Sequence, residues 1–252
     1  MKSSKHTARK LLLHEARIWC KLRHSHILEL DGFAHLGSME NVVLVSKLCP
    51  FGDLRDYINE KYPSKRQKTR LLWQAADAVK YLHNIGIIHG DLRGEKYNGS
   101  SLHNGSKLSQ KRWMAYELLE QSTPAPLGEV TEEQDYYGVN ESTDIYAFGC
   151  LTLEVLLSHA LCTVHLELTC GISQGITGED PYVGVDDDDL LEMKQAKLCP
   201  KRPDHSDIDQ DLWDLMKKCW NANPHDRGSA ADIYEVLKNG WPSQRRERPE
   251  SQ

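Results

Sequence analysis

Five stretches of the chain place apolar residues three or four positions apart, the spacing of an amphipathic helix. They are residues 8–23, 68–83, 190–196, 212–220 and 230–237. A shorter helix is expected after Asp53, whose carboxylate can cap free backbone N–H groups. Ser229 with Asp232 predicts a capped start for the last helix, and Gly240 predicts its end.

Residues 144–157 show a different pattern, because they are apolar nearly all round a helix. Such a helix belongs at the centre of a domain. Two short runs, residues 27–33 and 42–48, favour extended structure, and the second is rich in β-branched residues. The pattern therefore predicts an α+β protein with a small strand-bearing start and a large helical remainder.

Composition narrows the possible classes of protein. Of the 252 residues, 39% are hydrophobic and 27% are charged, as in an ordinary globular protein. A formal net charge of -6 argues against a nucleic-acid partner. The most apolar stretch, residues 145–157, is too short to cross a membrane and contains Glu154. The seven cysteines include no Cys-x-x-Cys pair, which favours reduced thiols and a cytoplasmic location.

The segment His89-Gly90-Asp91-Leu92-Arg93-Gly94-Glu95 offers the most specific chemistry. Phosphoryl transfer to a hydroxyl needs a carboxylate that accepts the proton and a cation near the phosphate. Asp91 and Arg93, two residues apart on a tight loop, could supply both. Taken alone, the segment also fits a simple turn after a helix.

Other motifs accompany this segment in a fixed order. They are Glu15 with Leu22-Arg23-His24-Ser25-His26-Ile27, Trp113–Leu119, Asp144–Gly149, Gly178–Tyr182 and Cys219–Arg227. Together they cover roughly residues 11–240 and resemble the protein kinase family, in particular its tyrosine-kinase-like group. The resemblance implies a kinase-like fold with an incomplete small β-containing N-lobe and a mainly α-helical C-lobe.

The resemblance also implies domain boundaries. Residues 1–49 would form the partial N-lobe, with the regulatory helix and the last strands. Residues 50–242 would form the C-lobe, with an insertion near residues 158–177, and residues 243–252 a disordered tail. With little sheet in the N-lobe, we expect an exposed strand edge and self-association through it.

The roles of individual residues follow from the same resemblance. Asp91 matches the catalytic base, and Arg93 takes the place of a lysine that steadies the transferring phosphate. Glu15 matches the glutamate that pairs with an ATP-positioning lysine. The hinge whose backbone reads adenine matches Lys47, Leu48 and Cys49. ATP and magnesium are the cofactors of the family, and a protein is the expected substrate or partner.

Four further residues match the scaffold of the family rather than its chemistry. Glu117 and Arg227 match a buried ion pair that ties the activation segment to the helical lobe. Asp144 matches a carboxylate that accepts backbone N–H groups of the catalytic loop. His89 belongs to the same loop and to the same structural set.

The departures from the family pattern concern ATP and its metal ion. Lys96 stands where an asparagine helps to hold magnesium, and no Asp-Phe-Gly motif occurs. The chain also starts too close to Glu15 to include the glycine-rich loop and the strand lysine. Because magnesium neutralises the phosphate charge, we expect a catalytically impaired pseudokinase that acts by binding a partner.

Two alternatives remain open at this point. The sequence could be a fragment or a mis-spliced form of an active serine/threonine kinase, since the missing motifs and the insertion would then share one cause. A non-enzymatic zinc-binding scaffold is suggested only by the spacing of His159, Cys162, His165 and Cys170.

Overall fold

The computed structural model describes most, but not all, of the chain. The described residues are 2–37, 42–94, 111–120, 138–158, 181–182, 184–205 and 207–240. The chain divides into two units, Met1–Pro50 and Phe51–Gln252. Lys96, the histidine and cysteine set of residues 159–170, and the tail of residues 243–252 lie outside the described residues.

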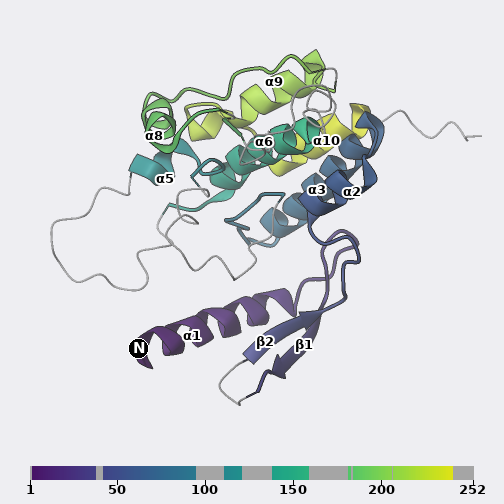
Figure 1. The fold of residues 1–252 in the computed structure, drawn as a ribbon, viewed down its shortest axis with the longest axis vertical. Helices are drawn as coiled ribbons and strands as arrows, with labels where there is room; N and C mark the ends of the chain where they lie inside the picture. The colour runs from purple at the N-terminus through teal and green to yellow at the C-terminus, as the bar shows by residue number, and fades with distance from the viewer. Residues whose placement is uncertain are drawn as a thin grey trace, which may run out of the picture. The chain divides into compact units, whose positions relative to one another are not determined.

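The first unit contains one helix and a two-stranded sheet (Figure 1). Helix α1 spans Lys2–Trp19, and it is followed by strands β1 (Leu30–His35) and β2 (Val42–Ser46). The strands are antiparallel, with Phe33 opposite Leu44. Helix α1 packs against β2. The sequence placed this helix at residues 8–23, so both of its predicted ends were wrong.

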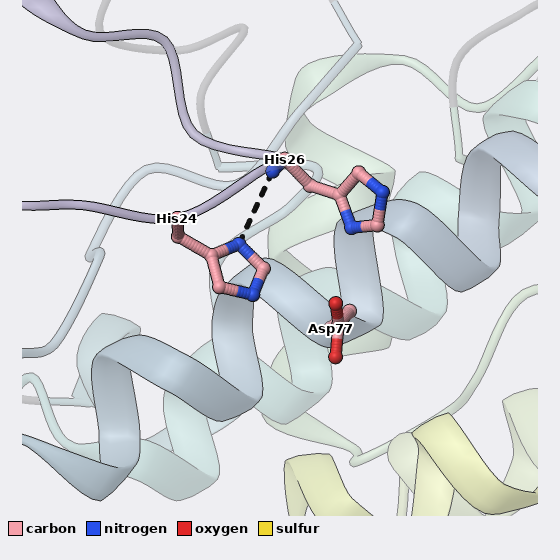
Figure 2. Close-up of side chains that lie close together, drawn as sticks. All are labelled: His24, His26 and Asp77. Carbon is pink, nitrogen blue, oxygen red and sulfur yellow. Dashed lines mark hydrogen bonds between the residues drawn. The ribbon is translucent and has the colours of Figure 1, made fainter.

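A turn between α1 and β1 replaces the first part of the predicted extended run. The backbone N–H of His26 donates to Nδ1 of His24 at 3.2 Å, as Figure 2 shows. The backbone N–H of Ile27 donates to the carbonyl of His24 at 3.1 Å. These local hydrogen bonds hold the backbone in a turn, so the strand begins at Leu30 rather than at Ile27.

The second unit is helical and is arranged around helix α6 (Glu141–Leu157). All residues of α6 from Thr143 to Leu157 are buried, which confirms the prediction of a central helix. Helix α3 (Lys65–Asn84) and helix α9 (Gln210–Cys219) both pack against α6. In the described parts of the chain, neither α6 nor any other helix has the length and apolar character that a membrane crossing requires.

Shorter elements complete the second unit. They are α2 (Leu54–Lys61), α5 (Tyr116–Glu120), α8 (Asp187–Gln195), the 3₁₀ helix η2 (Pro224–Asp226) and α10 (Ala230–Gly240). Helix α10 packs along α3. The sequence anticipated α2, α8 and α10 but not α5 or η2, which are too short to show a periodic pattern.

Capping residues fix the ends of several helices. Asp53 accepts a hydrogen bond from the backbone N–H of Asp56, and the Asp56 carboxylate accepts one from the backbone N–H of Asp53. Ser229 and Asp232 exchange the same pair of bonds at the start of α10. Both caps were predicted from the sequence, because this signal depends only on residues three positions apart.

Candidate functional site: the loop from His89 to Gly94

The loop begins at a carboxylate of the central helix. The two oxygens of Asp144, near the start of α6, accept the backbone N–H groups of His89 and Gly90, each at 2.8 Å. Nε2 of His83, in the last turn of α3, also lies 2.9 Å from the Asp144 carboxylate. Asp144 is buried, so these three contacts fix the start of the loop to α6. This is the arrangement that the family resemblance implies.

The next residues carry the chemically active side chains. Nη2 of Arg93 lies 3.2 Å from a carboxylate oxygen of Asp91. The Asp91 side chain is 57% exposed, whereas that of Arg93 is 9% exposed. Partial burial raises the pKa of Asp91, and the charges of Arg93 and His89 act against this rise. The loop therefore presents a carboxylate to solvent with a guanidinium bound to it.

The end of the loop rests on a second carboxylate of α6 that the sequence interpretation did not assign. The Glu154 side chain accepts the backbone N–H of Gly94 and the indole N–H of Trp113, each at 3.0 Å. Nη2 of Arg55, from α2, donates to Glu154 at 2.9 Å. Burial raises the pKa of Glu154, and Arg55 opposes this effect most strongly.

The sequence contained a signal for this contact. An acidic residue in the later turns of a helix that is apolar nearly all round must be buried, and a buried carboxylate needs hydrogen-bond partners. The signal does not say which residues those partners are. Gly94 is suited to the position, because a Cβ atom there would lie 2.6 Å from Oε1 of Glu154.

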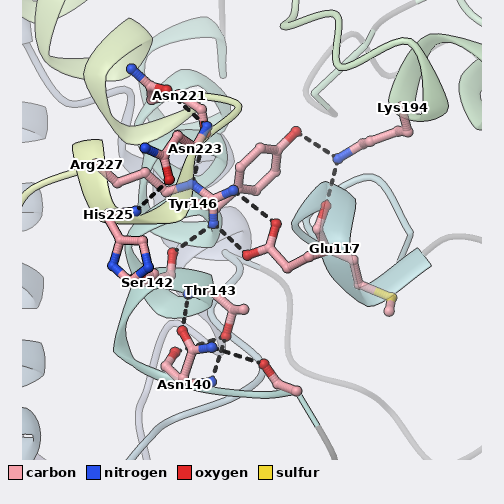
Figure 3. Close-up of polar contacts among 12 residues, drawn as sticks. Glu117, Asn140, Ser142, Thr143, Tyr146, Lys194, Asn221, Asn223, His225 and Arg227 are labelled. Atoms are coloured by element: carbon pink, nitrogen blue, oxygen red, sulfur yellow. Dashed lines mark hydrogen bonds and ion pairs between the residues drawn. The ribbon is translucent and has the colours of Figure 1, made fainter. Parts of the chain in front are cut away.

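An ion pair joins helix α5 to Arg227, the residue that directly follows η2 (Figure 3). Arg227 donates from Nη1 and Nη2 to the two carboxylate oxygens of Glu117, at 2.7 and 2.8 Å. Arg227 also donates to the carbonyls of Ser142 and Asn221. The Arg227 side chain is fully buried, whereas that of Glu117 is 23% exposed, so the pair is less enclosed than the resemblance implied.

The remaining predicted site residues belong to the first unit. Glu15 is exposed on α1, and it forms no ion pair with any side chain that the structure describes. Lys47, Leu48 and Cys49 follow β2 and are exposed, Leu48 by 89%. Asp91 and Arg93 belong to the second unit. The proposed roles of Glu15 and of residues 47–49 in holding ATP therefore stay predictions.

Comparison with known proteins identifies the family. The family model described as "Protein tyrosine and serine/threonine kinase" matches residues 1–97 and 94–237. These two segments cover most of the chain, so the chain belongs to this family. Its helices and small two-stranded sheet form an incomplete protein kinase-like fold.

Individual relatives include kinases of both substrate classes. The chain is 25% identical to serine/threonine-protein kinase 33 of Mus musculus, over 93% of its own length and 46% of that protein. It is 24% identical to Fer-related kinase 1 of Caenorhabditis elegans, over 94% of its length and 56% of the relative. It is also 24% identical to the tyrosine-protein kinase transforming protein Abl of Abelson murine leukemia virus, over 90% and 28% respectively. The chain thus spans about half the length of the first two relatives, and less of the third.

The donor groups of the loop do not fit the magnesium ion that kinases use with ATP. Between His89 and Gly94 the structure describes one carboxylate, Asp91, and it is already paired with Arg93. The family resemblance predicts that Lys96 stands where the family has a metal-binding asparagine, and a lysine ammonium cannot bind a metal ion.

Proposed function

We propose that this chain is a kinase-family domain that does not transfer phosphate efficiently and instead binds a protein partner. The observation that carries the proposal is Lys96 in place of a magnesium-binding asparagine, in a sequence without Asp-Phe-Gly. The two segments of the family match also overlap at residues 94–97, which include this position.

The physical reason is electrostatic. Catalysis of phosphoryl transfer consists largely of positioning and of neutralising the charge on the phosphates, and magnesium supplies much of that neutralisation. A lysine at position 96 replaces a metal ligand with a cation. Asp91 could still accept a proton from a hydroxyl group, but without the metal ion the phosphate would remain poorly activated.

The scaffold around the loop supports a binding role. Asp144 and Glu154 still fasten the two ends of the loop to α6, and Arg227 still holds Glu117. These contacts stabilise a shape without contributing a reaction step. A domain that keeps its scaffold and lacks its metal ligands is suited to presenting a surface to another protein.

A second candidate is that the sequence is a fragment or a mis-spliced form of an active serine/threonine kinase. The similarity to serine/threonine-protein kinase 33 favours it, and so does the break in the family match. Sequencing the transcript distinguishes the two proposals. A second transcript of the same gene that encodes the missing motifs would support the mis-spliced form, whereas transcripts that all encode this chain codon for codon would contradict it.

The test of the first proposal is a phosphate-transfer assay with radiolabelled ATP, magnesium and a general protein substrate. We expect the chain to transfer no more phosphate than its Asp91→Asn variant, which lacks the proposed base. A thermal-shift titration with ATP, with and without magnesium, accompanies the assay, and we expect magnesium to add no stabilisation. Transfer that Asp91→Asn abolishes would show that the domain is an active kinase.

We further propose that the chain associates with itself through the first unit. Phe33 in β1 is 69% exposed, and Leu36 and Leu48 are 61% and 89% exposed. Exposed apolar side chains beside a strand edge favour pairing between copies.

Sedimentation at increasing protein concentration tests this proposal. We expect a dimer whose dissociation constant rises in the Phe33→Ser variant, because serine removes the largest exposed apolar side chain of β1. Val236→Ser is the matched control, since Val236 is 45% exposed on α10 in the other unit. A monomer at every concentration would contradict the proposal.

A further inference from the structure

A buried lysine on α8 binds the segment that leads into α5. Nζ of Lys194 donates to the carbonyl oxygens of Arg112 and Met114, at 3.1 and 2.7 Å, and to the hydroxyl oxygen of Tyr146 at 2.8 Å. Figure 3 shows the Lys194 amine bound to the Tyr146 hydroxyl. Lys194 is completely buried, so the contacts to residues 112 and 114 join that segment to α8 in the interior.

All three partners of the Lys194 amine are neutral. Among the residues that the structure describes, no carboxylate lies within ion-pair distance of Nζ. The rings of Tyr146 and Tyr182 lie 4.4 and 4.8 Å from Nζ, and they attract a cation only weakly compared with a carboxylate. A charged lysine without a paired anion is costly to bury.

The tyrosine hydroxyl groups around Lys194 can form hydrogen bonds with either the charged or the neutral amine. The Tyr182 hydroxyl donates to the carbonyl of Leu198 at 3.0 Å, and its oxygen lies 2.8 Å from that of Tyr146. With a charged lysine, the Tyr146 proton therefore points to Tyr182. With a neutral lysine, that proton can turn to the free lone pair of the amine, while two N–H groups still bind the carbonyls of residues 112 and 114. Both backbone contacts survive in the neutral form.

The hydroxyl and thiol groups that are buried around Lys194 stay neutral near neutral pH. Burial raises the pKa of Tyr116, on α5, to about 12 and that of Cys150, on α6, to about 11. Burial also raises the pKa values of Tyr146 and Tyr182 well above the ordinary value. The ionisable side chains that also act on Lys194 are Arg112, Arg227 and Glu117, and Cys199 is a further thiol that acts on Tyr116.

We propose that Lys194 is a proton-sensitive latch, which holds the segment from Arg112 to Met114 against α8 when it is neutral and favours release of that segment when it is charged. Opening of the segment exposes the amine to water, where the charged form is stable. Acidification therefore loosens the segment that joins the loop region to α5. This device does not depend on whether the domain transfers phosphate.

The direction of the pH effect follows from the lysine itself. Burial lowers the pKa of Lys194 from 10.5 to about 7, with Arg227 and Arg112 acting in the same direction and with Cys150 and Glu117 opposing them. Between these two values the open state binds the proton and the closed state does not, so the closed state becomes more favourable as the pH rises. Below the lower value both states bind the proton, and the dependence disappears. One proton changes the equilibrium by at most about tenfold per pH unit.

Hydrogen exchange measures the opening directly. The exchange rates of the backbone amides of residues 111–119 are recorded from pH 6 to 8.5, and each rate is divided by its intrinsic rate at that pH. We expect protection in the unmodified chain to rise by about tenfold between pH 7 and 8.5, the dependence of one linked proton. The Lys194→Met variant, which has no amine, is expected to show no such rise.

Two comparisons make the result decisive. The Lys201→Met variant removes an exposed lysine and is expected to keep the rise in protection. A rise of the same size in Lys194→Met, or no rise in the unmodified chain, would overturn the proposal.

If Lys194→Met does not fold, the lysine ¹³Cε resonances of the unmodified chain are titrated by NMR instead. One of them should then titrate near pH 7, and the absence of any lysine that titrates below pH 9 would overturn the latch.

Discussion

Replacing Glu117 with glutamine should lower the free energy of unfolding by about 3–5 kcal/mol, the usual cost of leaving a buried charge without its partner. Arg227 is fully buried, and Glu117 binds both of its terminal nitrogens. Glutamine has nearly the same shape as glutamate, so the variant removes the negative charge without opening a cavity. The carbonyls of Ser142 and Asn221 remain, but they cannot balance a full positive charge.

Urea unfolding at fixed pH measures the effect, with Glu235→Gln as the control. Glu235 lies 4.0 Å from Lys238 on α10, and both side chains are more than half exposed. Such surface pairs contribute about 0–1 kcal/mol, so the control should unfold close to the unmodified chain. Equal midpoints for Glu117→Gln and Glu235→Gln would mean that the Glu117–Arg227 pair does not stabilise the domain.

Replacing Asp144 with alanine should have an effect of similar size. The carboxylate accepts hydrogen bonds from His89 and Gly90 and contacts His83, and it is 1% exposed. Alanine leaves these donors without an acceptor in the interior. Each unsatisfied buried group costs about 1–3 kcal/mol, so we expect a total loss of more than about 3 kcal/mol in urea unfolding.

The Asp144→Asn variant separates the hydrogen bonds from the packing of the side chain. Asparagine keeps one acceptor oxygen and the same size, so it should lose about half as much stability as alanine. If the alanine and asparagine variants were equally stable, the carboxylate would not be what holds the loop to α6.

The local signals of the sequence were sufficient for most of the helices. The apolar periodicity of α3 and the uninterrupted apolar character of α6 depend on neighbouring residues, and both helices were predicted. The turn at His24–Ile27 was missed, because short hydrogen bonds there outweigh the apparent extended run. Both ends of α1 were also placed wrongly.

The candidate site was only partly predictable. Its motifs identified the segment from His89 to Gly94 and the partners Asp144, Glu117 and Arg227. They did not indicate that Arg93 would bind Asp91, nor that Glu154 would hold the end of the loop. The first contact depends on the conformation of the loop, and the second joins the loop to a distant position on α6, so the spacing of residues within one element carries no information about either.

The sequence by itself determined the family and the order of the longer helices, and it contains the lysine at position 96 on which the proposed loss of activity rests. Each of these depends on residue identity or on short-range spacing. Only the tertiary structure decided which buried charges have partners. Arg227 meets a carboxylate from α5, whereas Lys194 meets neutral oxygens alone. Burial and the distance to other charges are properties of the packed chain. They leave Arg227 in a stable ion pair, whereas they lower the pKa of Lys194 so that its charge depends on pH.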